Sequence, residues 1–181
     1  MATATLIQPS EIIQGGLARQ TPTDIRFDAS LVSPHIRDAE ARWVVPVLTE
    51  AFYEVLAAEK GTSSAFSTVA YQELWDTHLK QYCAFACLYE AAPFVVMQMG
   101  SNGLYLNSNE YGQTAGQEGL KFWHDELAER LERKRDRLFA YLCSCAAALT
   151  GFDSSGAGCQ DPDCNTEDYS DFDKVLGVFL Y

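Results

Sequence analysis

Basic residues are scarce in this sequence. It has 13 Lys and Arg against 25 Asp and Glu, which gives a formal net charge of −12 at pH 7. Proteins that read nucleic acids draw much of their affinity from Lys and Arg side chains that neutralise phosphates. A chain this acidic is therefore not expected to bind DNA or RNA specifically, although it could surround DNA without gripping it.

Long hydrophobic runs are also missing. Apolar stretches such as Ala91–Met97 fall far short of the roughly 20 residues that a membrane helix needs, so no membrane partner is expected. The first five residues, Met1–Thr5, carry neither a basic region nor an apolar core, so no secretory signal is expected. These features favour a cytoplasmic setting, in which the six cysteines would be reduced thiols.

Recognisable catalytic motifs are missing as well. The three histidines, His35, His78 and His124, stand in no known metal or catalytic spacing. His78 lies on an apolar stripe, which favours a partly buried imidazole over a catalytic base. The glycines between Tyr111 and Gly119 follow no strand and precede no Lys-Ser or Lys-Thr pair, so they are not a phosphate loop. We therefore expect no catalytic residue and no cofactor, and do not expect an enzyme.

Four of the cysteines leave a metal or thiol site to consider. Cys159 and Cys164 lie five residues apart in an acidic stretch, and Cys143 and Cys145 lie two apart near the end of an expected helix. Structural zinc pairs usually have about two to four intervening residues, and two thiols separated by one helical residue diverge by about 200°. No metal site is therefore expected, while free thiol, disulfide and metal ligand stay open for the loop that carries Cys159 and Cys164.

The composition is that of a folded domain. At 181 residues, with 48% hydrophobic and 21% charged residues, the chain fits one core with extensions. We expect a mainly α fold: a helical bundle with a long helix in its carboxy-terminal half and one β-hairpin between helices. The expected divisions are an amino-terminal arm over residues 1–30, the bundle over 31–150 with the hairpin at about 93–108, and an acidic tether with an apolar tail over 151–181.

Two helical regions are expected before the hairpin. The first begins at Ser33 and Pro34, is kinked or divided at Pro46, and ends at Gly61. The second carries apolar residues three and four apart between Tyr71 and Ala92 and should end at Pro93. Within it, Cys83 and Cys87 share a face among apolar neighbours, which favours two buried thiols that pack as hydrophobic groups.

The hairpin and a long helix should follow. Residues Phe94–Met97 and Leu104–Leu106 favour strands, and Asn102-Gly103 between them is a turn signal. A capping box at Thr114 and Gln117 then predicts a helix of about thirty residues, roughly 45 Å long. Its segment from Glu129 to Arg137 is dense in both charges, which indicates a solvated face with i,i+4 ion pairs.

The last thirty residues change character. Between Asp153 and Lys174 there are seven carboxylates and one lysine, and the chain then ends in the apolar run Val175–Tyr181. An apolar end left in water would promote aggregation. We therefore expect the tail to dock on its own domain or on a partner.

The order of these pieces resembles the head-tail connector, or adaptor, proteins of tailed bacteriophages. The resemblance covers roughly residues 31–149. It is carried by apolar segments and turns, namely Leu31–Glu40, Val45–Leu48, Phe52–Leu56, Tyr71–Trp75, Tyr89–Phe94, the Asn102-Gly103 turn, and the charged helix that ends at Tyr141-Leu142.

The resemblance implies a virion structural protein at the neck of the particle, assembled in the host cytoplasm. Identical subunits, usually twelve, would form a ring on the portal protein, extend the DNA channel and present a platform for the next neck or tail component. Genomic DNA would pass through without specific binding. The residues implied in partner contacts are those of the hairpin turn and the apolar tail: Asn102, Gly103, Val175, Leu176, Val178, Phe179, Leu180 and Tyr181. The acidic insertion Asp153–Asp173 departs from the family pattern, which puts the carry-over of the tail contact in doubt.

The alternative is a metal- or thiol-dependent enzyme or regulator that uses the acidic region with Cys159 and Cys164. It predicts bound metal or a thiol of low pKa. A third hypothesis is a helical interaction domain of a cellular protein, which the sequence distinguishes poorly from a phage connector.

Overall fold

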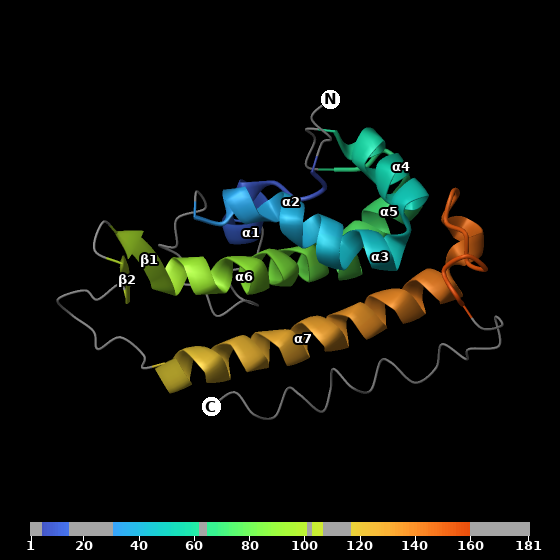
Figure 1. Cartoon of the computed structure of the whole chain (residues 1–181). Helices are drawn as coiled ribbons and strands as arrows, with labels where there is room; N and C mark the ends of the chain where they lie inside the picture. The colour runs from blue at the N-terminus through green and yellow to red at the C-terminus, as the bar shows by residue number, and fades with distance from the viewer. Residues whose placement is uncertain (1–4, 15–30, 62–64, 101–102, 107–116, 160–181) are drawn as a thin grey trace, which may run out of the picture.

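The fold consists of helices arranged around one central helix. The computed structural model describes residues 5–14, 31–61, 65–100, 103–106 and 117–159. Within these ranges the chain is mainly helical, so that expectation is confirmed. The central helix is α6 (Lys80–Val96), which runs beside the long helix α7 (Gln117–Ser144) in the opposite direction (Figure 1).

The first helical region is built from short pieces in close succession. A 3-10 turn at Ser33–His35 leads into α2 (Ile36–Ala39), a π-helical segment at Glu40–Val44 and α3 (Val45–Leu48). The Ser33 hydroxyl does not cap this region, since the 3-10 turn has no side-chain cap hydrogen bond.

The expected division of this region occurs at Thr49 rather than at Pro46. Thr49 has φ 68° and ψ 149°, a backbone region that is costly for a β-branched residue. Pro46 instead lies in α3, which directly follows the π-helical segment that ends at Val44, and the helical run continues through it to Leu48. Helix α4 (Glu50–Lys60) follows and ends at Gly61 as predicted, with φ 53° and its N–H donated to the Ala57 carbonyl oxygen.

The second helical region is longer than the sequence predicts. Helix α5 (Val69–Leu74) continues through a π-helical segment at Trp75–Leu79 into α6. Pro93 lies inside α6 and does not end it, so that prediction is wrong. In the last turn of a helix proline removes a single backbone hydrogen bond, and its fixed φ suits the helical backbone. Two short strands follow, β1 (Met97–Gly100) and β2 (Gly103–Leu106), paired antiparallel.

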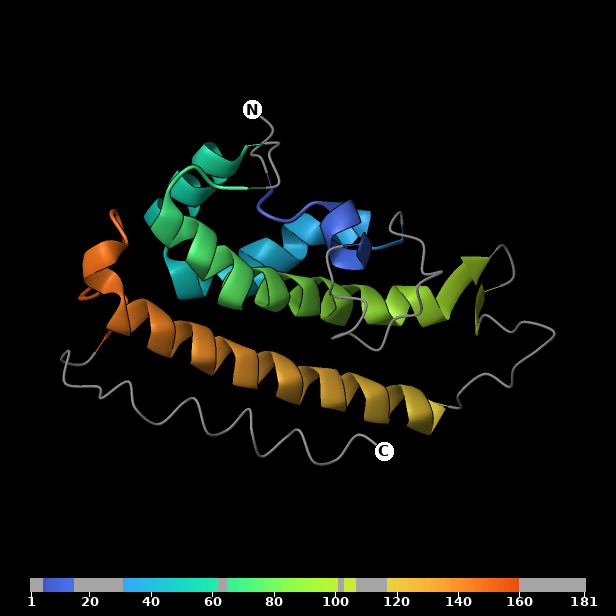
Figure 2. The same ribbon diagram turned by 180° about the vertical axis from the view of Figure 1, so that it is seen from behind.

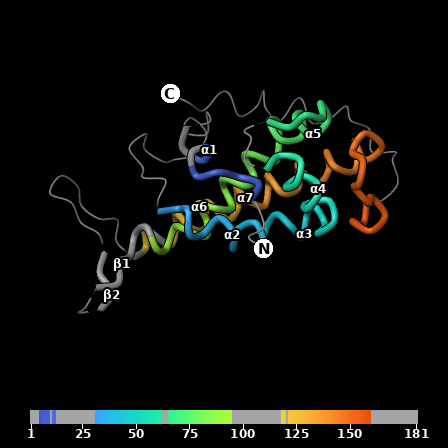
Figure 3. Tube along the Cα trace, turned by 90° about the horizontal axis from the view of Figure 1, so that it is seen from above, coloured from blue at the N-terminus to red at the C-terminus, as the bar shows by residue number. Residues whose placement is uncertain are grey.

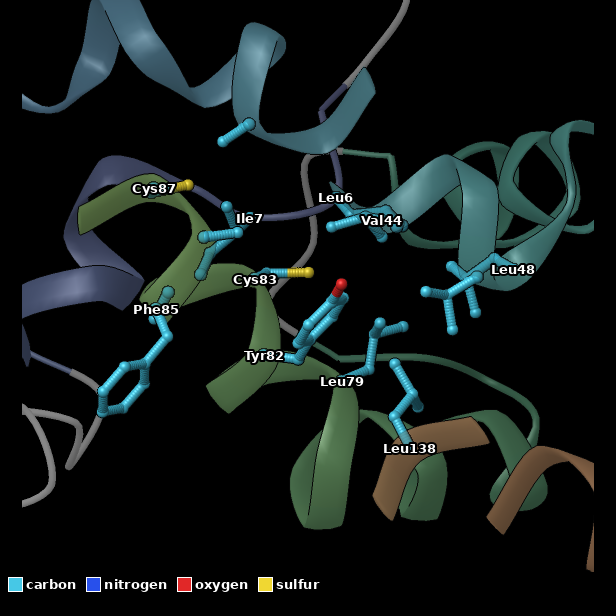
Figure 4. Packing of buried hydrophobic residues seen from close by; sticks show 14 of the residues in the cluster. Leu6, Ile7, Val44, Leu48, Leu79, Tyr82, Cys83, Phe85, Cys87 and Leu138 are labelled. Atoms are coloured by element: carbon cyan, nitrogen blue, oxygen red, sulfur yellow. The ribbon is translucent and has the colours of Figure 1, made fainter. Parts of the chain in front are cut away.

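Helix α6 is enclosed by the other elements. Its residues 82–88 are all buried, which is typical of a helix that is apolar on every side. Figure 2 shows α7 along one side of α6 and α1 (Pro9–Gln14) and α2 on the other, with β1 and β2 beyond its end. Seen from above, α1 and α2 flank α6 (Figure 3). Cys83 and Cys87 lie in this core as predicted, with Leu6, Ile7 and Tyr82 around them (Figure 4).

Helix α7 packs an apolar seam against the bundle and is close to its predicted length of about thirty residues. It has 28 residues and buries four leucines: Leu127, Leu131, Leu138 and Leu142. The polar break in the seam at Lys134 is accommodated, because its Nζ donates to Gln81 Oε1 at 2.9 Å and lies 4.9 Å from the centroid of the Phe85 ring. The opposite face carries the predicted ion pairs, Arg130 with Glu126 and Arg133 with Glu129.

Candidate functional site

Residues 5–14, hereafter the strap, pack against the helices rather than forming a free arm. Leu6 and Ile7 are 0% exposed, and Ile12 is 1% exposed. Within the strap, the backbone N–H of Gln8 donates to Glu11 Oε2 at 2.8 Å, which closes the first turn of α1 as in a capping box. The division expected at residue 30 therefore does not separate the strap from the core.

Lys60, in the last turn of α4, is the main polar anchor of the strap. Its side chain is 1% exposed, and Nζ donates to Glu11 Oε2 at 2.8 Å and to the carbonyl oxygen of Leu6. The same ammonium lies 3.6 Å from the ring centroid of Trp75, where a cation is attracted by the π-system. Burial lowers the pKa of Lys60, and the Glu11 carboxylate opposes that shift.

Glu40 is the second polar anchor. Its Oε1 accepts the backbone N–H of Ile7 at 2.9 Å, and its Oε2 accepts the Tyr53 hydroxyl at 2.7 Å. Burial raises the pKa of Glu40, and these two hydrogen bonds oppose the shift. The pKa of Tyr53 is also raised, first by burial and then by its bond to Glu40.

Glu40, Tyr53, Lys60 and Trp75 together form what we call the acceptor face. Glu40 is the first residue of the π-helical segment Glu40–Val44, and Trp75 is the first residue of the π-helical segment Trp75–Leu79. A π turn inserts one residue into a helix and re-aims the side chains around it, and such turns are frequent at functional sites. The acceptor face thus combines two unusual helical turns with a buried lysine and a buried carboxylate.

Sequence reasoning missed these residues for physical reasons. Lys60 stands next to a helix-ending glycine, where an exposed lysine is the ordinary expectation. Glu11 lies in a segment with little apolar periodicity. Glu40 lies in an expected helix, where a glutamate is ordinarily exposed and attracts no notice. A buried ion pair joins residues far apart in the chain, here separated by 49 positions, and leaves no local pattern. The π-helical turns that begin at Glu40 and Trp75 do mark the site, but they are seen in the structure and not in the sequence.

A disulfide-closed segment follows the carboxy-terminal end of α7. We call this segment, residues 143–159, the clasp. A disulfide joins Cys143 to Cys159, with a Cα–Cα distance of 5.5 Å. Inside the clasp, Phe152 is buried against the Phe52 ring at 5.4 Å between centroids, and the Tyr71 hydroxyl donates to the carbonyl oxygen of Thr150 at 2.5 Å. The bundle therefore extends to residue 159, and the expected tether begins later than residue 151.

The disulfide corrects the prediction of six reduced thiols. Cys143 pairs neither with Cys145 nor with a zinc ion, and Cys159 pairs with Cys143 rather than with Cys164, which lies outside the described residues. The pairing escaped sequence reasoning because a 3-10 turn at Ala146–Ala148 folds the chain back on itself. Among the described thiols, Cys83 and Cys87 are buried and Cys145 is partly exposed.

The histidines contact aromatic rings. His78 is half-buried, as expected, with its ring 4.6 Å from that of Tyr141, and His124 lies 4.2 Å from the Tyr89 ring. Burial raises the pKa of Tyr141 to about 12. In the part of the chain that the structure describes, no three His, Cys, Asp or Glu side chains are grouped so that they could hold a metal ion. No helix within these same ranges is long and apolar enough to span a bilayer.

Two of the five large apolar side chains that are exposed among the described residues, Phe94 and Leu31, lie close to His35 in sequence or in space. Phe94, three residues before β1, is 62% exposed and stacks on His35 at 4.6 Å. Leu31, which is 45% exposed, precedes the turn that carries His35. Of the predicted contact residues, Gly103 opens β2 opposite Gly100. The others lie outside the described residues: Asn102, Val175, Leu176, Val178, Phe179, Leu180 and Tyr181.

Comparison with known proteins places most of this architecture in one family. Residues 44–162, about two thirds of the chain, match the sequence profile of DUF6712, described as a family of unknown function. The chain belongs to the DUF6712 family. No curated protein and no solved structure matches it. The DUF6712 region contains Tyr53, Lys60, Trp75 and the clasp, whereas the strap and Glu40 precede it.

Proposed function

We propose that this DUF6712 protein is a head-tail connector subunit of a tailed bacteriophage. Identical copies form a ring on the portal, extend the DNA channel and support the next neck or tail component. The observation that carries the proposal is the order of elements: short helices over 36–60, the apolar helix α6, the strands β1 and β2, and the long charged helix α7. This is the order in which the connector-like segments of the sequence occur.

The shape of the molecule supports the same proposal. The strands extend past the end of α6, away from the clasp at the other end of the helix pair (Figures 1 and 2). Exposed Phe94 lies at the base of these strands. Exposed aromatic side chains often serve as anchors in protein interfaces, and we assign the strands and Phe94 to contacts between neighbouring subunits.

The charge of the chain fits a channel through which DNA slides. The net charge is −12, and a lumen rich in carboxylates offers DNA few phosphate contacts that would hold it. Three arginines of α7 are paired with acidic residues of the same helix: Arg130 with Glu126, Arg133 with Glu129, and Arg135 with Glu132 at 2.7 Å. They are therefore partly neutralised where they lie.

The alternative, a metal- or thiol-dependent enzyme, draws on Cys159 and Cys164 as a functional pair. Cys159 is bonded to Cys143, so it serves as neither a free thiol nor a thiolate ligand. No specific observation favours this alternative.

The tail gives the first test of the connector proposal. Deletion of Val175–Tyr181 should leave the circular dichroism spectrum unchanged, because the described core ends at residue 159, and should weaken capture by immobilised portal protein at least about tenfold, which corresponds to about 1.4 kcal/mol. The matched control changes Asp168, Asp171 and Asp173 to Asn and keeps the apolar end. Full capture after the deletion would remove the tail from the interface.

A further inference from the structure

The contacts of the strap are those of a peptide bound to a preformed surface. Two apolar side chains, Leu6 and Ile7, enter the core beside α6 (Figure 4), and polar groups of the acceptor face hold the strap backbone at the same two residues. Glu40 accepts the N–H of Ile7, and Lys60 binds the carbonyl oxygen of Leu6. Glu11 then adds one charged contact, to Lys60 at 2.8 Å. Apolar anchors combined with main-chain hydrogen bonds are a general mode of peptide recognition.

The chain between strap and helices is long enough to reach a neighbour. Seventeen peptide steps separate Gln14, at the end of the strap, from Leu31, and at about 3.3 Å per residue they span up to about 56 Å. Helix α7, with 28 residues, is about 42 Å long at 1.5 Å per residue. Fully extended, a connection of this length would be longer than α7, so covalent geometry does not confine the strap to its own acceptor face.

Docking of the strap makes the same contacts whether the acceptor face belongs to its own chain or to another copy. Such an exchange of identical elements is a low-cost route to assembly, because no new interface has to be built. In an assembled ring the next acceptor face is held nearby, which raises its effective concentration.

We propose that the acceptor face binds the strap of a neighbouring copy, so that straps are exchanged between subunits when the protein assembles. Residues 5–14 are the ligand, and Glu40, Lys60 and Trp75 of the next copy are the receptor. The inference rests on the proposed function in one respect, that copies of this chain associate.

A charge-swap experiment with full-length chains tests the exchange. One copy carries Lys60→Glu and the other carries Glu11→Lys. Alone, each variant places like charges together at the anchor, whether the strap docks in its own chain or in an identical copy. In an exchanged mixture both anchors regain opposite charges. The strap of the Lys60→Glu copy brings its native Glu11 to the native Lys60 of the other copy, and the strap of the Glu11→Lys copy brings its lysine to the new glutamate. The two variants are unfolded in denaturant, mixed in equal amounts, refolded and examined by native mass spectrometry and thermal unfolding.

The expected result is a complex that contains both variants and melts at least about 5 °C above either one alone, a shift that is readily resolved for a domain of this size. A single chain that carries both substitutions is the folding control for the reversed pair. Gln8→Asp is the control for an added charge on the strap, since Asp is favourable at this helix-capping position.

Two results would overturn the inference, and they differ in what they say about the ring. If oligomers form but the mixture melts in two transitions, each at the temperature of one variant alone, strap exchange is refuted and ring assembly is not. A mixture and a wild-type protein that both stay monomeric would refute exchange and also count against the connector proposal.

Discussion

At the scale of single residues, Lys60 illustrates how a buried charge is tolerated. Its ammonium group meets a carboxylate, a carbonyl oxygen and an aromatic face, each of which stabilises the charged form. Burial alone works in the opposite direction and lowers the pKa of this lysine. Breaking such a pair on one side is costly, because the remaining charge stays buried without a counter-charge.

Glu11→Gln should therefore destabilise the fold strongly. It keeps a side-chain oxygen for the Gln8 N–H but removes the negative charge beside Lys60, and we expect a loss of about 3 kcal/mol in the free energy of unfolding. Urea denaturation followed by circular dichroism measures it. Glu129→Gln is the matched control: it breaks an exposed ion pair with Arg133 and should cost less than about 0.5 kcal/mol. Equal effects of the two substitutions would show that the strap is not anchored by Glu11.

His78 should make stability depend on pH. Burial, followed by the nearby charges of Arg137 and Lys134, lowers its pKa from the ordinary 6.5. As pH falls, the unfolded chain takes up this proton before the folded chain does, so stability is lost as pH drops through 6.5. The loss is at most about 1.4 kcal/mol for each pH unit in which only the unfolded state is protonated.

The measurement is the free energy of unfolding from about pH 8 to about pH 5.5, where this histidine contribution falls. In a His78→Gln variant this part of the decline should be absent, whatever the variant's stability at high pH. Parallel curves for wild type and variant would mean that His78 is protonated equally well in the folded state.

At the scale of elements, the sequence predicts most helices but misplaces their junctions. Apolar spacing places α6 because burial of one face dominates helix stability, whereas α4 and α7 follow from the stop at Gly61 and the capping box at Thr114 and Gln117. It failed at Pro93, where the helix continues, and at Thr49, where the backbone breaks without Pro or Gly. Pro93 lies in the last turn, where the helix tolerates it, and Thr49 adopts a positive φ that a β-branched residue does not favour; intrinsic propensity predicts neither outcome.

The candidate site was less predictable than the fold. The predicted contact residues Asn102 and Val175–Tyr181 lie outside the described residues, so their role stays a prediction. The strap and the clasp depend on contacts between distant positions, Glu11 with Lys60 and Cys143 with Cys159. Composition and spacing carry no information about such pairs.

Opening the disulfide of the clasp should have a local effect on the fold. Cys143 and Cys159 are 16 residues apart, and opening a loop of that size costs about 3 kcal/mol in the chain-entropy model. A Cys159→Ser variant should unfold at lower urea, and amides of residues 145–159 should exchange faster while those of α6 keep their protection. Cys145→Ser, which removes a thiol outside the disulfide, is the control. Unchanged exchange in the clasp would show that its packing on Phe52 and Tyr71 suffices without the bond.

At the scale of the whole molecule, the chain consists of a helical core, a strap docked at one side and a clasp at one end. Strands and exposed Phe94 lie at the end opposite the clasp (Figure 1). The residues shared with the DUF6712 family cover α3 to the clasp, so the acceptor residues Lys60 and Trp75 belong to the shared part and the strap to the part before it. Under the connector proposal, the strands and Phe94 form the surface that contacts neighbouring subunits.

The central claim, that this protein is a neck component of a virion, is tested most directly by counting it in particles. Calibrated peptide mass spectrometry of purified virions gives the number of copies relative to the portal protein. The account predicts a ratio near one to one, with the protein retained after the particles are washed at high salt. Absence of the protein from particles, with the portal present at its normal level, would contradict the claim.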